Sequence, residues 1–165
     1  MKVIGIDRDG SCMIVVSVDP GMKGGIAILD TETNQMKAVP TPLIGKEIDY
    51  RRVHEALTFY EPSIIVVEKV HAMPKQGVTS MFNFGLGYGA IVALATVSTA
   101  RLVLVTPQMW KKHILAGTNK DKDAAIQFCN HTYPNVNLIL PRCRNAHDGM
   151  ADAICLAHYG AHYVK

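Results

Sequence analysis

The chain has 165 residues, of which 48% are apolar and 19% are charged. This length suits one domain, and this balance excludes an intrinsically disordered protein. The formal net charge of +3 is too small for a highly basic nucleic-acid-binding tail.

Strands dominate the first part of the chain. A continuous β-branched run at 13–18 predicts a strand buried on both faces. A Gly-rich turn joins it to a second run at 26–29, as in a hairpin, and 35–39 predicts a third strand. The apolar spacing over 46–59 predicts an amphipathic helix, and 63–70 predicts another buried strand.

Helices dominate the second part. Small and apolar residues at 79–99 predict a long helix, and 102–105 predicts a short strand. Thr106 and Pro107 open a short helix. A further helix runs from Asp121 or Asp123 through Cys129, and the last from Asn145 or Asp148 through Tyr159. This alternation predicts an α/β fold in which helices flank a mixed five-stranded sheet. We expect a single domain over 1–165, with 1–12 interpreted as an N-terminal extension.

The cysteines and the apolar segments indicate the compartment. No two of the four cysteines form a C-x-x-C pair, which argues against a zinc ribbon or a thioredoxin-like motif. Residues 1–5 lack a signal-peptide core. The stretch 84–105 contains small and hydroxyl residues and Arg101, so it predicts a buried helix and then a strand rather than a membrane span. We therefore expect a reduced, cytoplasmic protein with no membrane contact.

Four acidic residues stand where carboxylates are costly or where ligands bind. Glu68 lies inside an apolar strand run, where an acid needs a cation or a partner. Asp19 follows the first strand, at a strand end where ligands collect in such sheets. Asp148 and Asp152 lie one helical turn apart, so they repel each other unless a cation lies between them. Alone, Asp19 could serve a turn, Asp148 a helix cap and Glu68 a salt bridge.

Together the four acids indicate a metal site. Oxygen ligands without Cys or His partners suit Mg²⁺, with Mn²⁺ as a substitute. Two such ions about 4 Å apart can activate water against a phosphodiester.

Three segments that hold these acids resemble the RuvC-type Holliday-junction resolvases. They are 18–21, 67–77 and 147–153, and the Ala-Met-Pro-x-Gln-Gly and Asp-Gly-x-Ala-Asp-Ala patterns are similar to the phage and prophage branch. The resemblance implies an RNase H-like fold, a homodimer, and Mg²⁺-dependent hydrolysis of four-way DNA junctions in a bacterial cell or a phage-infected host. It places Asp19, Glu68, Asp148 and Asp152 at the catalytic, metal-binding positions. Bacterial members usually space the last two acids three apart, whereas the spacing here is four.

Basic and polar residues near these segments are the candidates for DNA contacts, because lysines and arginines on loops and helix starts commonly hold phosphates. They are His71, Lys75, Gln76, Lys111, Lys112, Lys120, Lys122, Arg142 and Arg144. Taken singly, each exposed lysine is more often just a solvated surface residue. Trp110, the only tryptophan, could stack on a base or pack in the core. Helix 79–99 is the expected dimer face.

Two other functions stay open. A nuclease of the same fold could cut a wider set of branched DNAs, or RNA. A non-catalytic protein could bind junctions without cutting them. The broader nuclease would differ from a junction resolvase in its range of substrates. The binding protein would differ because it cleaves no substrate with any divalent metal.

Overall fold

Five strands form one mixed sheet in the computed structural model, which describes residues 13–71 and 77–164. The strands are β1 (Ile14–Asp19), β2 (Gly25–Asp30), β3 (Gln35–Pro40), β6 (Ile64–Glu68) and β7 (Arg101–Val105), in the order β3-β2-β1-β6-β7. The first three pair antiparallel, whereas β1, β6 and β7 run parallel. The predicted mixed five-stranded sheet is therefore confirmed. The extension predicted at 1–12 lies outside the described residues.

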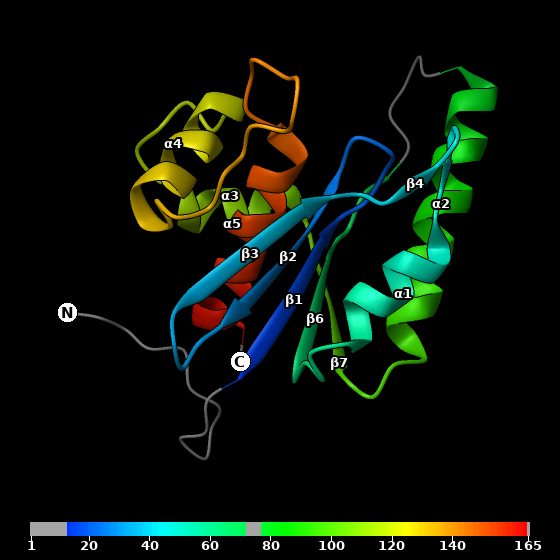
Figure 1. Ribbon diagram of the computed structural model, residues 1–165, viewed down its shortest axis with the longest axis horizontal. Helices are drawn as coiled ribbons and strands as arrows, with labels where there is room; N and C mark the ends of the chain where they lie inside the picture. The colour runs from blue at the N-terminus through cyan, green and yellow to red at the C-terminus, as the bar shows by residue number, and fades with distance from the viewer. Residues whose placement is uncertain (1–12, 72–76, 165) are drawn as a thin grey trace.

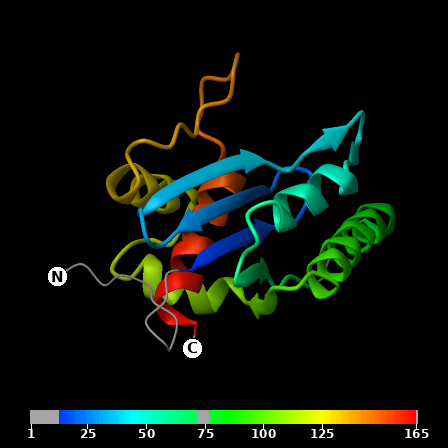
Figure 2. The same ribbon diagram turned by 60° about the horizontal axis from the view of Figure 1, so that its bottom comes forward.

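Helices cover both faces of the sheet (Figures 1 and 2). One face carries α3 (Pro107–Ile114), α4 (Lys122–Thr132) and α5 (Asp148–Tyr163), and the other carries α1 (Tyr50–Thr58) and α2 (Val78–Thr96). Successive residues of a strand point to opposite faces. Val15 of β1 accordingly lies in the core under α5, and Val16 lies in the core under α1 and α2. This explains why β1 and β6 are apolar at nearly every position.

The helix predicted over 46–59 is wrong at its beginning. Residues 43–48 form a small hairpin of β4 (Leu43–Ile44) and β5 (Glu47–Ile48), and the helix begins only at Tyr50. Gly45 adopts a φ of 63° at the turn, a conformation that interrupts a helix. Asp49 then caps α1 by accepting a hydrogen bond from the Arg52 amide at 3.2 Å. The apolar Ile48 is buried from β5, not from a helix.

The long helix α2 is far more exposed than the buried helix that the sequence predicts. Only Gly87, Ile91 and Ala95 of its 19 residues are buried. Within the described residues it is also the one helix whose length and composition would allow it to cross a membrane. Only 17% of its most apolar 18-residue stretch is buried. A helix that is apolar on every side has no periodicity to mark its buried face, so the sequence could not show which residues pack.

The other helices begin where their caps predict. Thr106 caps α3 with Pro107 at its first position, and Asp121 caps α4 by accepting from the Ala124 amide at 2.9 Å. The last helix begins at Asp148, the later of the two predicted starts. Because of these two caps, α3 begins directly after β7, and α4 begins directly after the loop at 115–121. Both helices begin near the end of the sheet where Asp19 and Glu68 lie.

Candidate active site

Two acids meet at the carboxyl edge of the sheet because of strand register. β1 and β6 are parallel neighbours, and Val18 pairs with Val67. The next residue on each strand is an acid, Asp19 on β1 and Glu68 on β6. Parallel strands end at the same edge, so the fold brings together two carboxylates that are 49 positions apart (68 minus 19).

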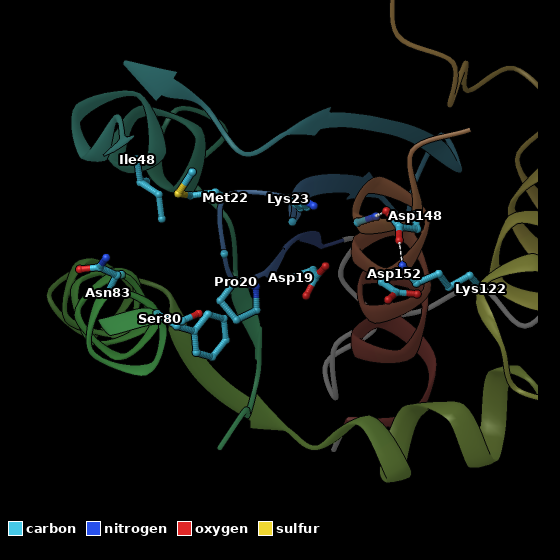
Figure 3. Close-up of a pocket in the computed structure, with 15 residues that line it drawn as sticks. Asp19, Pro20, Met22, Lys23, Ile48, Ser80, Asn83, Lys122, Asp148 and Asp152 are labelled. Carbon is cyan, nitrogen blue, oxygen red and sulfur yellow. Dashed lines mark hydrogen bonds and ion pairs between the residues drawn. The ribbon is translucent and has the colours of Figure 1, made fainter. Parts of the chain in front are cut away.

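Two further acids come from α5, which packs closely on β1 and β2. Near its beginning, a Cβ atom on Gly149 would lie 2.2 Å from the carbonyl oxygen of Lys23, so only glycine permits this approach. One turn later, the hydroxyl of Ser17 in β1 donates to the carbonyl oxygen of Ala153 at 2.6 Å. These contacts hold α5 so that Asp152 faces Asp19 (Figure 3).

His147, rather than Asp148, caps α5. Its Nδ1 accepts a hydrogen bond from the Met150 amide at 3.1 Å, which leaves the Asp148 carboxylate free of the capping role. Asp148 instead forms an ion pair with Lys122 at the start of α4 (Figure 3). The interpretation of Asp148 as the helix cap is therefore wrong, because the imidazole of His147, one residue earlier, accepts the hydrogen bond from the Met150 amide.

Burial raises the pKa of three of these acids, and neighbouring negative charge adds to the shift for two of them. Burial raises the pKa of Asp19 to about 8, and the charges of Glu68, Asp152 and Asp148 add to the shift. Burial likewise raises the pKa of Asp152 to about 6 and shifts that of Glu68 upward. The pKa of Asp148 moves the other way, because Lys122 binds it. The surroundings of Asp19, Glu68 and Asp152 thus disfavour the ionised carboxylates, which a bound cation would favour.

Two lysines of the predicted set reach this cluster. The charge of Lys111 in α3 lowers the pKa of Asp19, Glu68 and Asp152, so its ammonium acts on all three acids. Lys122 reaches Asp148 directly. Both lysines belong to short helices that begin near the carboxyl edge of the sheet, which explains why they act on the acids there.

A cleft of about 600 Å³ opens between α5 and α2 at the acidic cluster. Asp19 lies between the two helices, with Asp148 and Asp152 on one wall and Ser80 and Asn83 on the other (Figure 3). A second hollow of about 400 Å³ shares Lys23 and Asp148 with this cleft and is lined also by Arg144. Sequence reasoning missed Lys23, Ser80 and Asn83, since isolated polar residues on a turn and on an apolar helix carry no motif.

The remaining predicted DNA contacts lie outside this cluster. His71, Lys112, Lys120 and Arg142 are exposed, and Arg144 borders only the second hollow. Lys75 and Gln76 lie outside the described residues. The structure thus joins Lys111 and Lys122 to the acids and leaves the others as solvent-facing candidates.

The four carboxylates have the donor chemistry for a hard divalent cation. They offer oxygen ligands only, and their mutual repulsion is relieved by a positive ion. Over residues 13–71 and 77–164, no three Asp, Glu, His or Cys side chains already converge on a single coordination point. One oxygen of Asp148 is bound to Lys122. The chemistry of the four donors therefore fits a divalent cation, although the four carboxylates do not yet converge on one coordination point.

Comparison with known proteins places the fold. No protein-family model and no curated protein matches the chain. The Thermus thermophilus RuvC structure is similar with a TM-score of 0.63 and 20% identity, over 92% of this chain and 95% of that one. RuvC of the same organism in complex with Holliday junction substrate has a TM-score of 0.62 and 16% identity, over 92% and 94%. The chain has an RNase H-like fold.

A viral enzyme shares this RNase H-like fold. The fowlpox virus Holliday junction resolvase has a TM-score of 0.52 and 21% identity, over 87% of this chain and 94% of that one. Nearly the full length of each of these chains takes part in the match. The fold class predicted from the sequence is confirmed.

Proposed function

We propose that this protein is a Mg²⁺-dependent endonuclease that resolves four-way DNA junctions by paired phosphodiester hydrolysis. The observation that carries the proposal is the gathering of Asp19, Asp148 and Asp152 around one cleft at the sheet edge where Glu68 also ends its strand. The similarity of the fold to solved Holliday junction resolvases supports the choice of substrate.

Asp19, Glu68, Asp148 and Asp152 would hold the cations. When bound there, Mg²⁺ supplies an activated water and stabilises the leaving oxygen of the phosphodiester. Lys122 would release Asp148 to the metal, and its exposed ammonium would then be free to meet a DNA phosphate. Lys111, whose charge acts on three of the acids, would stabilise the negative charge that develops on the phosphate.

The cleft between α5 and α2 suits one strand of a DNA backbone. Its acidic wall would bind the phosphate through metal, and Lys23 and Arg144 extend a positive edge along the adjoining hollow. Arg142 and Lys120 adopt positive φ angles on exposed loops, and their charges face solvent. Lysine and arginine contacts of this kind fix the position of a backbone without reading sequence.

A homodimer would place two such sites on one junction. The residues Val78, Phe82 and Leu86 are four apart on α2 and form an exposed apolar stripe. A contiguous exposed apolar patch commonly marks an interface. A second copy packed there would relate two acidic clusters by a two-fold axis, which matches the symmetry of a four-way junction.

The test is cleavage of a labelled, immobile four-way junction with Mg²⁺. The wild-type protein is expected to make symmetric nicks near the crossover, whereas Asp19→Asn and Glu68→Gln bind the junction and leave it intact. A Y-shaped fork, a duplex and an RNA–DNA hybrid are run in parallel. Equal cutting of all four substrates would indicate a broader nuclease. Binding without cleavage in both Mg²⁺ and Mn²⁺ would contradict the catalytic function.

A further inference from the structure

The single tryptophan of the chain contacts an acid of the candidate active site. The indole Nε1 of Trp110 donates a hydrogen bond to Oε1 of Glu68 at 2.8 Å. Trp110 is fully buried and Glu68 is 8% exposed. A buried ring cannot stack on a DNA base, so the stacking alternative for Trp110 is wrong. Packing alone is also an incomplete description, since the polar edge of the ring is aimed at a carboxylate.

The fold creates this contact through β7 and the start of α3. Glu68 pairs with Val105, the last residue of the neighbouring strand. Thr106 caps α3 immediately afterwards, and Trp110 follows one turn into the helix. Side chains on a helix lean toward its N-terminus, which directs the indole back to the end of β6. The contact therefore depends on the short distance between strand end and helix start.

The chemistry of the pair favours an ionised Glu68. An indole N–H can only donate, so its bond is strongest with a carboxylate. The ammonium of Lys111 lies 5.2 Å from the centre of the Trp110 ring, a cation–π contact on the face of the same indole. Both Trp110 and Lys111 act on Glu68 in the same direction and oppose the effect of its burial on the pKa.

The hydrogen bond uses one oxygen of Glu68. The indole binds Oε1, which leaves Oε2 as the oxygen that would turn to a cation. A carboxylate held by one oxygen has fewer rotamers to lose when the second oxygen binds a cation. Groups that orient a metal ligand in this way commonly change metal affinity or activity by about 10- to 100-fold when they are removed.

We propose that Trp110 is a positioning residue, whose indole N–H holds Oε1 of Glu68 so that Oε2 is presented to the divalent cation. The inference rests on the proposed function, because it assigns Glu68 to a metal site. Trp110 itself touches neither DNA nor the reacting phosphate, since it is enclosed by the protein.

The first test compares Trp110→Phe with the wild-type protein. Phenylalanine keeps an aromatic ring in the core and removes the N–H. We expect calorimetric titration with Mn²⁺ to show about 10-fold or greater loss of affinity. The turnover of junction cleavage should fall, whereas junction binding in EDTA stays unchanged.

Tyr133→Phe is the matched control. The Tyr133 hydroxyl is hydrogen-bonded to Nδ1 of His158 at 2.7 Å, within the same hydrophobic core but away from the acids. This variant also loses one buried hydrogen bond at an aromatic ring. It should bind Mn²⁺ and cut junctions as the wild-type protein does. Circular dichroism melts establish that both variants fold.

A second measurement needs no variant of Trp110. Because the chain has one tryptophan, indole emission excited selectively over that of the tyrosines reports on the surroundings of Trp110, which include Glu68. Paramagnetic Mn²⁺ should quench this fluorescence in the wild-type protein, with the same midpoint as the calorimetric titration, and Glu68→Gln should abolish the saturable quenching. Absence of saturable quenching in a wild-type protein that binds Mn²⁺ would overturn the inference, even if Trp110→Phe fails to fold.

The failure of this inference is separable from that of the proposed function. If Trp110→Phe binds Mn²⁺ and cuts junctions as the wild-type protein does, the positioning role is wrong and the nuclease stands. A loss of cleavage with unchanged Mn²⁺ affinity also overturns the positioning role. If the wild-type protein neither binds Mn²⁺ nor cuts, both proposals are wrong.

Discussion

The hydroxyl of Ser17 donates a 2.6 Å hydrogen bond to the carbonyl oxygen of Ala153, and both residues are fully buried. This bond ties β1 to α5 two residues before Asp19 and one residue after Asp152. It therefore links the two elements that carry facing acids. Substitution of Ser17 can therefore separate an effect on the stability of the fold from an effect on the geometry of the site.

Replacing Ser17 by Ala is expected to reduce cleavage more than stability explains. The lost bond should cost about 0.5–1.5 kcal/mol in the free energy of unfolding, and α5 should shift relative to Asp19. Thr31→Val is the control, because the Thr31 hydroxyl is also buried, donating to the Met13 carbonyl and accepting from the Met13 amide, both at 2.9 Å, just after β2 ends and at the opposite end of that strand from Asp19. Urea melts and junction cleavage are measured for both. Equal loss of cleavage would show that Ser17 acts through stability alone.

Asp19→Asn should stabilise the metal-free protein at neutral pH. The folded-state pKa of about 8 lies above the ordinary value of 3.8, so between these values the folded protein retains a proton that the unfolded chain releases. Stability consequently falls as pH rises through this window. The amide removes that dependence, with an expected gain of about 0.5–2 kcal/mol near neutral pH.

Thermal melts in EDTA from about pH 4 to about pH 9 check the expectation for Asp19. The difference in stability between Asp19→Asn and wild type should grow with pH and level off above about 8. Adding Mg²⁺ should stabilise the wild-type protein and leave the variant unchanged. A difference that is constant with pH would contradict the raised pKa.

Gly149→Ala should disrupt the seat of α5 on the sheet. The new Cβ would lie 2.2 Å from the carbonyl oxygen of Lys23, and both sides of this contact are backbone. We expect a loss of at least about 2 kcal/mol, as for other overpacked sites, together with loss of cleavage. Gly89→Ala is the control, since nothing lies within 4 Å of its Cβ position on α2. That change should be neutral or stabilise the helix by up to about 1 kcal/mol in chemical denaturation.

Lys111→Met should reduce junction cleavage by about 10²–10³-fold, as expected when one charge-stabilising group is removed from an active site. The neighbouring Lys112 is exposed and lines neither of the two hollows at the acids. Lys112→Met should therefore cut within a few-fold of the wild-type rate. Single-turnover kinetics at saturating enzyme separate this effect from weaker DNA binding. Similar rates for the two variants would rule out a special role for Lys111.

Phe82→Glu should convert the proposed dimer to a monomer, because a charge in an apolar interface is left desolvated. Phe82 is 70% exposed on α2. Phe59, which is 76% exposed just after α1, provides the control Phe59→Glu. Light scattering after size-exclusion chromatography measures the mass of each. A wild-type monomer, or a dimer that survives Phe82→Glu, would contradict an α2 interface.

Local sequence determined the elements that end near the site. Continuous β-branched runs predict β1 and β6, since a strand covered on both faces has no polar positions. Thr106, Pro107 and Asp121 predict the starts of α3 and α4, because caps act on amides a few residues away. The four acids could be proposed as a group because each stands at a strand end, inside an apolar strand or on one helix turn.

Only the tertiary structure decided which groups meet. The contact between Trp110 and Glu68 spans 42 residues and depends on the parallel pairing of β6 with β7. The exposure of α2 and the ion pair of Lys122 with Asp148 likewise depend on how separate elements pack. Helix and strand formation are local, whereas burial and charge pairing arise from residues distant in sequence. The sequence by itself therefore predicts the acids of the candidate site, and the fold alone assigns their partners.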